Sequence, residues 1–231
     1  MHQWQLFLSF LVFAMASTST TAAGTLHYWS MKARGYPIAV IAKAAGVDLS
    51  WPAESEEASD RRLEEHQAAG ILTFNQWPML ELDGKRIVQS GAIMRLLARR
   101  GGLSGDDEDE FVLSETLMCE AEDIFQAMAK AHYDQKDGSN CSAWDKFFSE
   151  WFSKHCGYLE KLIPESGPFF KSGPKRLAGG LYLACVLDSC LDIEPKSLDN
   201  FPKLKRFEEA MLALPEFAVR QGRDIYFKRL G

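Results

Sequence analysis

The spacing of apolar residues changes its character at residues 104–110, a run of Ser, Gly, Asp and Glu. Before this run, short β-prone segments alternate with helical ones, whereas after it every apolar segment has helical spacing. Strands interleaved with helices build a mixed sheet, and successive amphipathic helices pack on one another. The sequence therefore predicts an α/β domain over residues 25–102, a linker over 103–110 and an all-helical domain over 111–231.

The first of these domains has the predicted order βαβαββα. Four short segments have the composition of strands: residues 25–29, 48–51, 79–82 and 86–88. Three have helical features: residues 36–46, 54–69 and 90–102. Pro37 and Gly46 bound the first helix, Asp83-Gly84 is a hairpin turn between the last two strands, and Ser90 is a good N-cap.

The second domain consists of amphipathic or apolar segments alone. These are residues 111–133, 143–162, 177–191 and 207–214. Residues 177–191 are nearly all apolar, which predicts a helix in the middle of a bundle. At 231 residues and 46% hydrophobic composition, the chain is long enough to bury a core in each domain.

Residues 1–24 contain no Lys, Arg, Asp or Glu, and residues 6–16 are apolar. That run is shorter than the roughly 20 residues that cross a bilayer, and Ala14-Met15-Ala16 fits a small-residue cleavage site. We expect a cleaved signal and a secretory or extracellular location, with no stable membrane span afterwards. An uncleaved anchor, a buried helix and a plastid-directed leader remain open alternatives.

Charge and cysteine content exclude several classes of function. The net charge is −6 and there is no basic tract, so we expect no nucleic-acid binding. No CxxC pair or His/Cys spacing indicates a metal site. We expect most of the cysteines to be small buried apolar side chains. Asn140-Cys141-Ser142 is a glycosylation sequon, a pattern that also occurs by chance.

The segment from Gln76 to Ser90 is the most informative for chemistry. Pro78 directly precedes a predicted strand, and a cis Trp77-Pro78 bond would present the backbone of residue 77 to a peptide-like ligand. Gln89-Ser90 lies where a strand meets a helix, and N–H groups at a helix start bind carboxylates. An ordinary N-cap is the simpler interpretation of Ser90 taken alone.

These segments together resemble the glutathione S-transferases, in particular the tyrosine-type alpha and sigma classes. The resemblance extends over residues 25–225 and is weaker in the helical half. It is carried by Leu26-His27-Tyr28-Trp29, Arg34, residues 44–47, Asn75-Gln76-Trp77-Pro78, residues 83–93 and 97–99, Phe201-Pro202-Lys203-Leu204 and Leu214-Pro215.

The resemblance implies a thioredoxin-like domain joined to a helical domain, a homodimer, and glutathione as co-substrate without a metal. Tyr28 then lies where the family has its catalytic tyrosine, with Arg34 supporting the thiolate electrostatically. A free thiol titrates near about 8.5, and a phenol that donates a hydrogen bond to the thiolate lowers that pKa. A packed strand aromatic is the alternative role for Tyr28, and a surface charge is the alternative for Arg34.

The resemblance also assigns the parts of glutathione. Gln76, Trp77 and Pro78 would bind the cysteinyl part, and Gln89 and Ser90 the γ-glutamyl carboxylate. Glu115 falls near the position of a partner-subunit acid that contacts the γ-glutamyl amine. A charged helix face explains Glu115 equally well.

Two features depart from the family pattern. The Trp and Lys that usually bind the glycine carboxylate are missing from residues 64–70, where His66 and Gln67 are the available donors. A Ser/Thr-x-x-Asp capping box is missing from residues 175–180, which we expect to cost about 1 kcal/mol.

Three functions follow as hypotheses. The first is conjugation of glutathione to small electrophiles, with glutathione-dependent isomerisation or peroxide reduction as variants of the same thiolate chemistry. The second is a non-catalytic binding or structural protein on this scaffold. The third, a thiol oxidoreductase, requires a Cys near residues 28–36, and the sequence has none there.

Overall fold

The computed structural model describes residues 23–136, 138, 142–170 and 176–229. Residues 1–22 of the predicted leader and the sequon residues Asn140 and Cys141 lie outside these ranges, whereas residues 23 and 24, also assigned to the leader, belong to the first strand. Within the described ranges, no helix is both long and apolar enough to cross a bilayer.

The first domain is built on a four-stranded sheet in the order β3-β1-β4-β5. Its strands are β1 Ala23–His27, β3 Asp48–Ser50, β4 Met79–Leu82 and β5 Lys85–Val88. β1 is parallel to β3 and antiparallel to β4, and β4 and β5 form a hairpin. Asp83 and Gly84 both adopt positive φ in its turn, as the predicted two-residue turn requires.

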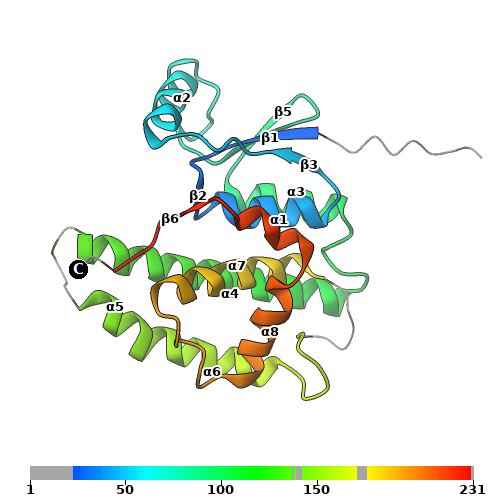
Figure 1. The fold of residues 1–231 in the computed structure, drawn as a ribbon. Coiled ribbons are helices and arrows are strands. Elements are labelled where there is room, and N and C mark those ends of the chain that lie inside the picture. The colour runs from blue at the N-terminus through cyan, green and yellow to red at the C-terminus, as the bar shows by residue number, and fades with distance from the viewer. Residues whose placement is uncertain (1–22, 137, 139–141, 171–175, 230–231) are drawn as a thin grey trace, which may run out of the picture.

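Three helices complete this domain: α1 Gly35–Ala44, α2 Glu56–Ala68 and α3 Ser90–Arg100. α1 and α3 lie between the sheet and the helical domain, whereas α2 lies on the far side (Figure 1). The buried faces of β1 and β4 are strongly apolar, with Leu26, Met79 and Leu80 fully buried. The observed order of elements confirms the predicted βαβαββα pattern, with an additional short strand, β2 Met31–Lys32.

The second domain is a bundle around α7 Ala178–Ile193, which is buried along almost its whole length. Its other helices are α4 Glu108–Lys136, α5 Ala143–Lys146, η1 Phe147–Phe152, α6 Ser153–Leu162, α8 Pro202–Leu212 and η2 Pro215–Arg220. The predicted helix over 143–162 is a continuous run with a π-helical segment, η1, in its middle. α4 begins inside the predicted linker because Asp107 caps it, accepting a hydrogen bond from Glu110 N–H at 2.8 Å.

The start of α7 lacks a side-chain cap, as its sequence suggests, but its first N–H groups have partners from elsewhere. Ala178 N–H donates to the carbonyl of Leu103 at 2.9 Å, and Gly179 N–H donates to Ser114 Oγ at 3.2 Å. A Cβ at Gly179 would overlap the carbonyl oxygen of Ser114. Glycine therefore lets α7 approach α4 closely enough for these tertiary bonds to replace the missing box.

The C-terminal tail contradicts the expectation that everything after residue 110 is helical. β6 Asp224–Ile225 pairs in parallel with β2 of the first domain, and Asp224 N–H donates to the Ser30 carbonyl at 3.0 Å. The tail crosses from the helical domain to the first domain (Figure 1). A strand of two residues is too short to show the alternation of apolar and polar residues from which strands are predicted. Directly after β6, the rings of Tyr226 and Phe227 pack against that of His132 on α4, with centroids 5.2 and 5.6 Å away.

A buried ion cluster also joins the two domains. Lys32 Nζ contacts Asp188 Oδ2 at 3.0 Å and also pairs with Asp192. Tyr36 donates to the same Asp188 carboxylate at 3.0 Å, and so does Arg220 at 3.0 Å. Lys32 and Asp188 are each only 6% exposed, so a charged pair here is stable only with all its partners in place.

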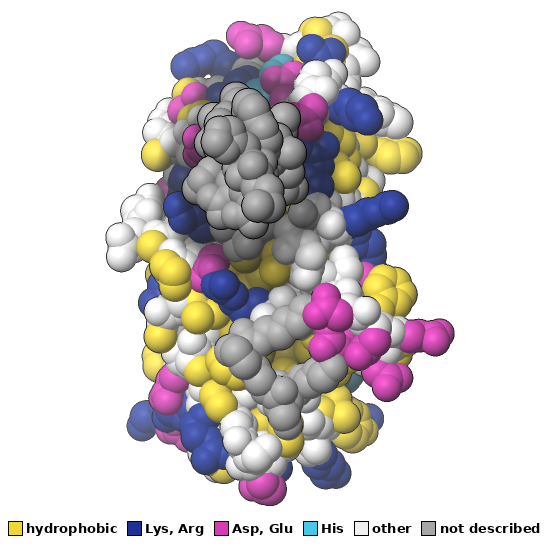
Figure 2. Space-filling model, turned by 90° about the vertical axis from the view of Figure 1, so that its right-hand side faces the viewer, with side chains coloured by type: hydrophobic (Ala, Val, Ile, Leu, Met, Phe, Trp, Pro, Cys, Tyr) yellow, Lys and Arg dark blue, Asp and Glu magenta, His cyan; other side chains and the backbone are white. Residues whose placement is uncertain are grey.

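The burial of three cysteines and the mixture of charges on the surface agree with what the composition predicts. Cys156, Cys185 and Cys190 are buried as predicted, whereas Cys119 is exposed. On the face that Figure 2 shows, Lys and Arg side chains are interspersed with Asp and Glu. No broad basic surface is visible among the described residues of that face, in agreement with the net charge.

Candidate functional site

Tyr28 follows the last residue of β1 and is 7% exposed. Its phenolic oxygen accepts a hydrogen bond from the backbone N–H of Arg34 at 3.4 Å. Gly35 begins α1 directly beneath the ring, and a Cβ there would lie 2.6 Å from Tyr28 Cδ1. The strand end and the helix start thus hold the phenol from two sides.

The environment of Tyr28 keeps its hydroxyl protonated. Burial raises the pKa of Tyr28 to about 12, although the hydrogen bond and the charge of Arg34 partly oppose this. A phenol with this pKa is neutral near pH 7 and has one O–H to donate. The Arg34 N–H occupies an acceptor position, so the proton of Tyr28 is available for an anion.

A cavity of about 320 Å³ lies beside Tyr28. Its walls are mainly apolar, with Met31, Phe125 and Phe227 among the lining residues. At its edge the hydroxyls of Tyr133 and Tyr226 share a hydrogen bond of 2.5 Å. A largely apolar cavity of this size, with the Tyr28 hydroxyl beside it and Glu56 and Asp60 also in its lining, suits a small molecule that is mainly hydrophobic.

Arg34 connects this cavity to a second one. Its guanidinium donates to Ser90 Oγ at 3.2 Å and to the two carboxylate oxygens of Glu122 at 2.9 and 3.2 Å, and it lies over the ring of Phe125. Burial disfavours the charge, but the Glu122 carboxylate outweighs it and raises the pKa of Arg34. Tyr182 donates to Glu122 at 2.6 Å and so holds the pair in place.

The second cavity, of about 350 Å³, lies at the start of α3. Its lining includes Arg34, Gln89, Ser90, Arg95 and Glu122. Gln89 has a φ of 73°, a conformation that non-glycine residues adopt only when their surroundings enforce it. The N-terminal end of α3 and two arginines border this space together with the carboxylates of Glu122 and Asp123, so a ligand group of either charge would find partners there.

The Trp77-Pro78 bond is cis, as the sequence suggested. Trp77 is buried, with its ring edge-on to that of Trp29 at 5.3 Å between centroids, whereas Gln76 is exposed. The indole N–H of Trp77 donates to His66 Nδ1 at 3.2 Å. The neutral His66 ring therefore carries its proton on Nε2.

The structure brings some predicted site residues together and leaves others apart. Tyr28 lines the first cavity, Gln89 and Ser90 line the second, and Arg34 lines both. Gln76, Trp77, Pro78 and Glu115 line neither. Glu115 instead forms an ion pair with Arg95 of the same chain at 2.8 Å.

Sequence reasoning missed the contribution of the helical domain to this site. Four of its site residues lie on one face of α4: Glu122, Phe125, Ala129 and Tyr133. Their spacing of three or four residues is a readable signal, because such positions share a helix face. Tyr182, Tyr226 and Phe227 had no comparable signal, since they reach the site through the packing of α7 and the return of the tail.

The described residues contain no group of three or more His, Cys, Asp or Glu side chains that could hold a metal ion.

Comparison with family models gives two matches. Residues 24–99 match the model described as "Glutathione S-transferase, N-terminal domain", and residues 122–218 match "Glutathione S-transferase, C-terminal domain". Among curated proteins, glutathione S-transferase alpha-3 of Rattus norvegicus is 28% identical over 193 residues, covering 82% of this chain and 84% of that protein. Glutathione S-transferase of Gallus gallus is 26% identical over the same length, with the same coverage.

Solved structures share the architecture. A Pi-class glutathione S-transferase of Onchocerca volvulus superposes with a TM-score of 0.73 at 23% identity, covering 84% of this chain and 90% of that one. Prostaglandin synthase D of Nilaparvata lugens gives a TM-score of 0.72 at 21% identity, covering 85% of this chain and 95% of that one. At these identities the likeness establishes the fold.

Proposed function

Because this chain belongs to the glutathione S-transferase family, we propose that it conjugates the glutathione thiolate to small electrophiles, with Tyr28 as the donor that stabilises the thiolate. The observation that carries this proposal is the neutral phenol of Tyr28, held beside an apolar cavity of about 320 Å³. Arg34 links that cavity to the start of α3, where the γ-glutamyl end of glutathione would lie.

The thiolate is the nucleophile, and its population at neutral pH limits the reaction. A hydrogen bond from a neutral donor to an anion contributes about 1.5–3 kcal/mol, which lowers the pKa of the thiol by about one to two units. The glutathione thiol first loses its proton to solvent. Attack of the thiolate then forms the carbon–sulfur bond, and the electrophile's leaving group departs with the electrons of the bond that breaks. Tyr28 keeps its proton throughout.

Recognition of the tripeptide follows from the positions of the polar groups. Ser90 and Gln89 at the start of α3 bind the γ-glutamyl carboxylate, and the backbone of Trp77 pairs with the cysteinyl part. His66, whose Nδ1 accepts the Trp77 indole N–H, has its Nε2–H as a candidate donor to replace the missing glycine-carboxylate anchors. Gln67 is already committed, donating to the Asn75 carbonyl at 2.9 Å.

The γ-glutamyl amine finds its acid in a homodimer. Glu115 pairs with Arg95, which lines the second cavity of the same chain, and in a homodimer the Glu115 of a second copy would contact the γ-glutamyl amine. Exposed apolar side chains at Phe74, Phe111 and Val112 support such an association. Sedimentation of the wild-type chain tests it, with a monomer as the contradicting result.

Turnover of a model aryl halide by Tyr28→Phe tests the catalytic proposal. We expect kcat/KM at pH 7 to fall by about 10- to 100-fold, because the variant keeps the ring and removes only the donor. Tyr158→Phe, at an exposed tyrosine on α6, is the matched control and should leave turnover unchanged. Equal turnover of wild type and Tyr28→Phe would rule out the proposed role.

A second candidate is a glutathione-binding protein without transferase activity. Two hydrogen bonds favour this candidate: Gln67 donates to the Asn75 carbonyl, and Arg62 donates to Glu54. Both side chains are therefore occupied, and few free donors remain for the glycine carboxylate. Calorimetry with glutathione, combined with the turnover assay, separates the cases. Binding of glutathione without turnover supports this second candidate. Glutathione-dependent isomerisation or peroxide reduction that disappears in Tyr28→Phe instead supports a variant of the transferase proposal.

A further inference from the structure

The C-terminal end of a tripeptide bound at the proposed site would lie against α2. Its γ-glutamyl end lies at the start of α3 and its cysteinyl part pairs with the backbone of Trp77, so the last residue extends past Trp77, away from Ser90. α2 lies on the opposite side of the sheet from α3 (Figure 1). There His66 accepts the Trp77 indole N–H at 3.2 Å, and the guanidinium carbon of Arg62 lies 5.4 Å from the centre of the indole ring.

Two donors of α2 are already committed to groups of the protein. Arg62 donates to one carboxylate oxygen of Glu54 at 2.8 Å and pairs with the other at 2.7 Å. Gln67 donates to the Asn75 carbonyl at 2.9 Å. The Nε of Arg62 has no partner among the described residues, but it is fully covered and so out of reach of a ligand. Neither side chain is available as a counterion.

His66 contributes a hydrogen-bond donor without a positive charge. Burial, with the charges of His27 and Arg62 next, lowers the pKa of His66. The ring of His27 lies edge-on to it, with 4.8 Å between centroids. Protonation of Nδ1 would also place a second donor opposite the Trp77 indole N–H. His66 therefore presents a single neutral N–H at Nε2, which suits a carbonyl oxygen.

The charges of α2 make these surroundings negative. The helix contains five acidic residues and two arginines. Its C-terminal end, which carries the negative pole of the helix dipole, begins at His66. Nearer the start of α2, Glu56 and Asp60 line the Tyr28 cavity, and Asp60 accepts the indole N–H of Trp29 at 2.8 Å. A carboxylate placed beside this helix would meet repulsion from the nearby acids.

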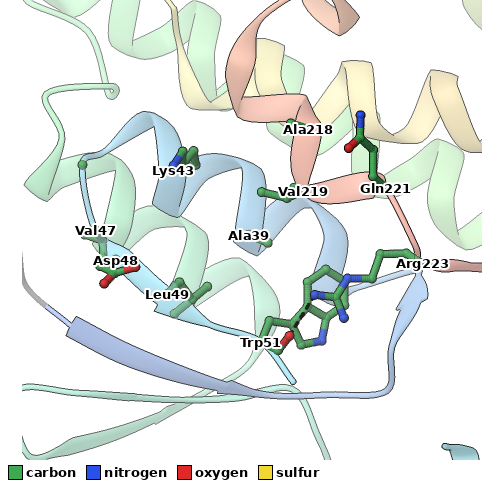
Figure 3. Close-up of a pocket in the computed structure, with 11 residues that line it drawn as sticks. Ala39, Lys43, Val47, Asp48, Leu49, Trp51, Ala218, Val219, Gln221 and Arg223 are labelled. Atoms are coloured by element: carbon green, nitrogen blue, oxygen red, sulfur yellow. Dashed lines mark hydrogen bonds between the residues drawn. The ribbon is translucent and has the colours of Figure 1, made fainter. Parts of the chain in front are cut away.

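Three cations that form no ion pair with a described residue lie elsewhere. Arg61 is exposed and lies about 140° around α2 from His66. Lys43 and Arg223 line a groove between α1, β3 and η2, where Arg223 donates to the Trp51 carbonyl at 2.8 Å, drawn as a dashed line in Figure 3. That groove shares no lining residue with the two cavities of the candidate site. These cations are therefore not placed beside His66.

We propose that the site prefers γ-glutamylcysteinyl peptides whose C-terminal end carries no negative charge, such as glutathione amide, to glutathione itself. The carbonyl of a C-terminal amide accepts from His66 Nε2–H, and its NH₂ group donates to the acidic side chains of α2. A carboxylate at the same place loses hydration without gaining a counterion. This selectivity rests on the proposed glutathione site, because that site fixes where the C-terminal end lies.

Calorimetric titration of the full chain with S-methylglutathione and with its C-terminal amide tests the proposal. We expect the amide to bind about two- to fivefold more tightly. Asp60→Asn keeps an acceptor for Trp29 and removes one negative charge, so it should tighten binding of the acid about twofold and leave the amide unchanged. Gln67→Lys keeps a donor for the Asn75 carbonyl and adds a cation, so it should reverse the preference. Glu209→Gln makes the same charge change as Asp60→Asn on α8 and is the control, with an unaltered ratio.

Binding of the acid as tightly as the amide, or the same ratio of affinities in wild type and Gln67→Lys, would overturn the proposal. Because the titration contains no electrophile, its result does not depend on turnover. A preference for the amide without turnover of an aryl halide would contradict the transferase proposal alone. Binding of neither peptide would contradict both.

Discussion

Two clusters of charged side chains link the thioredoxin-like domain to the helical domain, one around Arg34 and Glu122 and the other around Lys32 and Asp188. Both pair a base from the first domain with an acid from the second. They differ in their surroundings: Lys32 and Asp188 are almost fully buried, whereas the side chains of Arg34 and Glu122 are 27% and 36% exposed and border two cavities.

This difference in exposure suggests that the buried ion pairs stabilise the domain interface, whereas the exposed ion pair serves the functional site. In the sealed cluster every donor and acceptor serves the interface, so removing one group leaves a buried charge without a partner. In the open cluster water screens the pair, and Arg34 has Ser90 and Tyr28 as further neighbours. We therefore expect substitutions in the first cluster to change stability and those in the second to change activity.

The largest expected effect is that of Asp188→Asn. This variant removes the charge that balances Lys32 and Arg220, and we expect a loss of about 3–5 kcal/mol in the free energy of unfolding. Chemical denaturation of the full chain measures it. Asp145→Asn, which breaks an exposed pair with Arg229, is the control and should cost less than about 1 kcal/mol. Similar losses in the two variants would contradict the distinction between sealed and exposed pairs.

Glu122→Gln is the matching substitution in the open cluster. We expect a smaller loss of stability, about 1–2 kcal/mol, because the pair is half-exposed and glutamine keeps an acceptor for Tyr182. Arg34 loses its bidentate partner, so the KM for glutathione should rise several-fold while the fold persists. Steady-state kinetics and denaturation on the same sample measure both. A stability loss as large as that of Asp188→Asn would remove the contrast between the clusters.

Glu208 extends the comparison because it is a buried acid near Asp188 that forms no ion pair with a described residue, although the charges of Arg220 and Lys205 partly oppose that of Asp188. Its Oε1 has no hydrogen-bond partner among the described residues, and burial, with the charge of Asp188 second, raises the pKa of Glu208 to about 7. The unfolded carboxyl has an ordinary pKa near about 4.3, so the folded chain binds the extra proton and stability falls as the pH rises from about 4.5 to 7.

Glu208→Gln should therefore stabilise the protein by about 1–2 kcal/mol at pH 8 and leave it unchanged at pH 4. Thermal or chemical unfolding at the two pH values measures this difference. A gain of the same size at both values would show that packing, and not the proton, determines the effect.

The sequence predicted the parts of this molecule that depend on local pattern. The turn at Asp83-Gly84 and the start of α3 near residue 90 follow from residue types and short spacing. The predicted N-cap was wrong, because Gln89 holds that position without a side-chain capping bond and Ser90 is the first residue of the helix. The predicted strand over 25–29 also ends earlier, at His27, so that Tyr28 follows β1. Prediction failed where long-range packing decides. β2 and β6 pair residues 193 positions apart, at Met31 and Asp224, and two-residue strands have no periodicity of their own.

The residues of the functional site likewise fall into those that local sequence predicts and those that long-range packing brings in. Tyr28, Arg34 and Ser90 are contiguous with readable elements, and the structure places them around adjoining cavities. Glu122 and Tyr182 complete the site only because α7 packs against both α1 and α4. Gly179 permits the close approach of α7 to α4, and no local signal specifies that contact. A single sequence does not predict side chains that reach the site only through tertiary packing.

The pKa of the glutathione thiol bound to the protein tests the central claim most directly. Ultraviolet absorbance of the thiolate, followed across a pH titration at saturating protein, measures it in wild type and in Tyr28→Phe. We expect a pKa of about 6.5–7.5 in wild type and a return to about 8.5 in the variant. The same pKa in both proteins would contradict it.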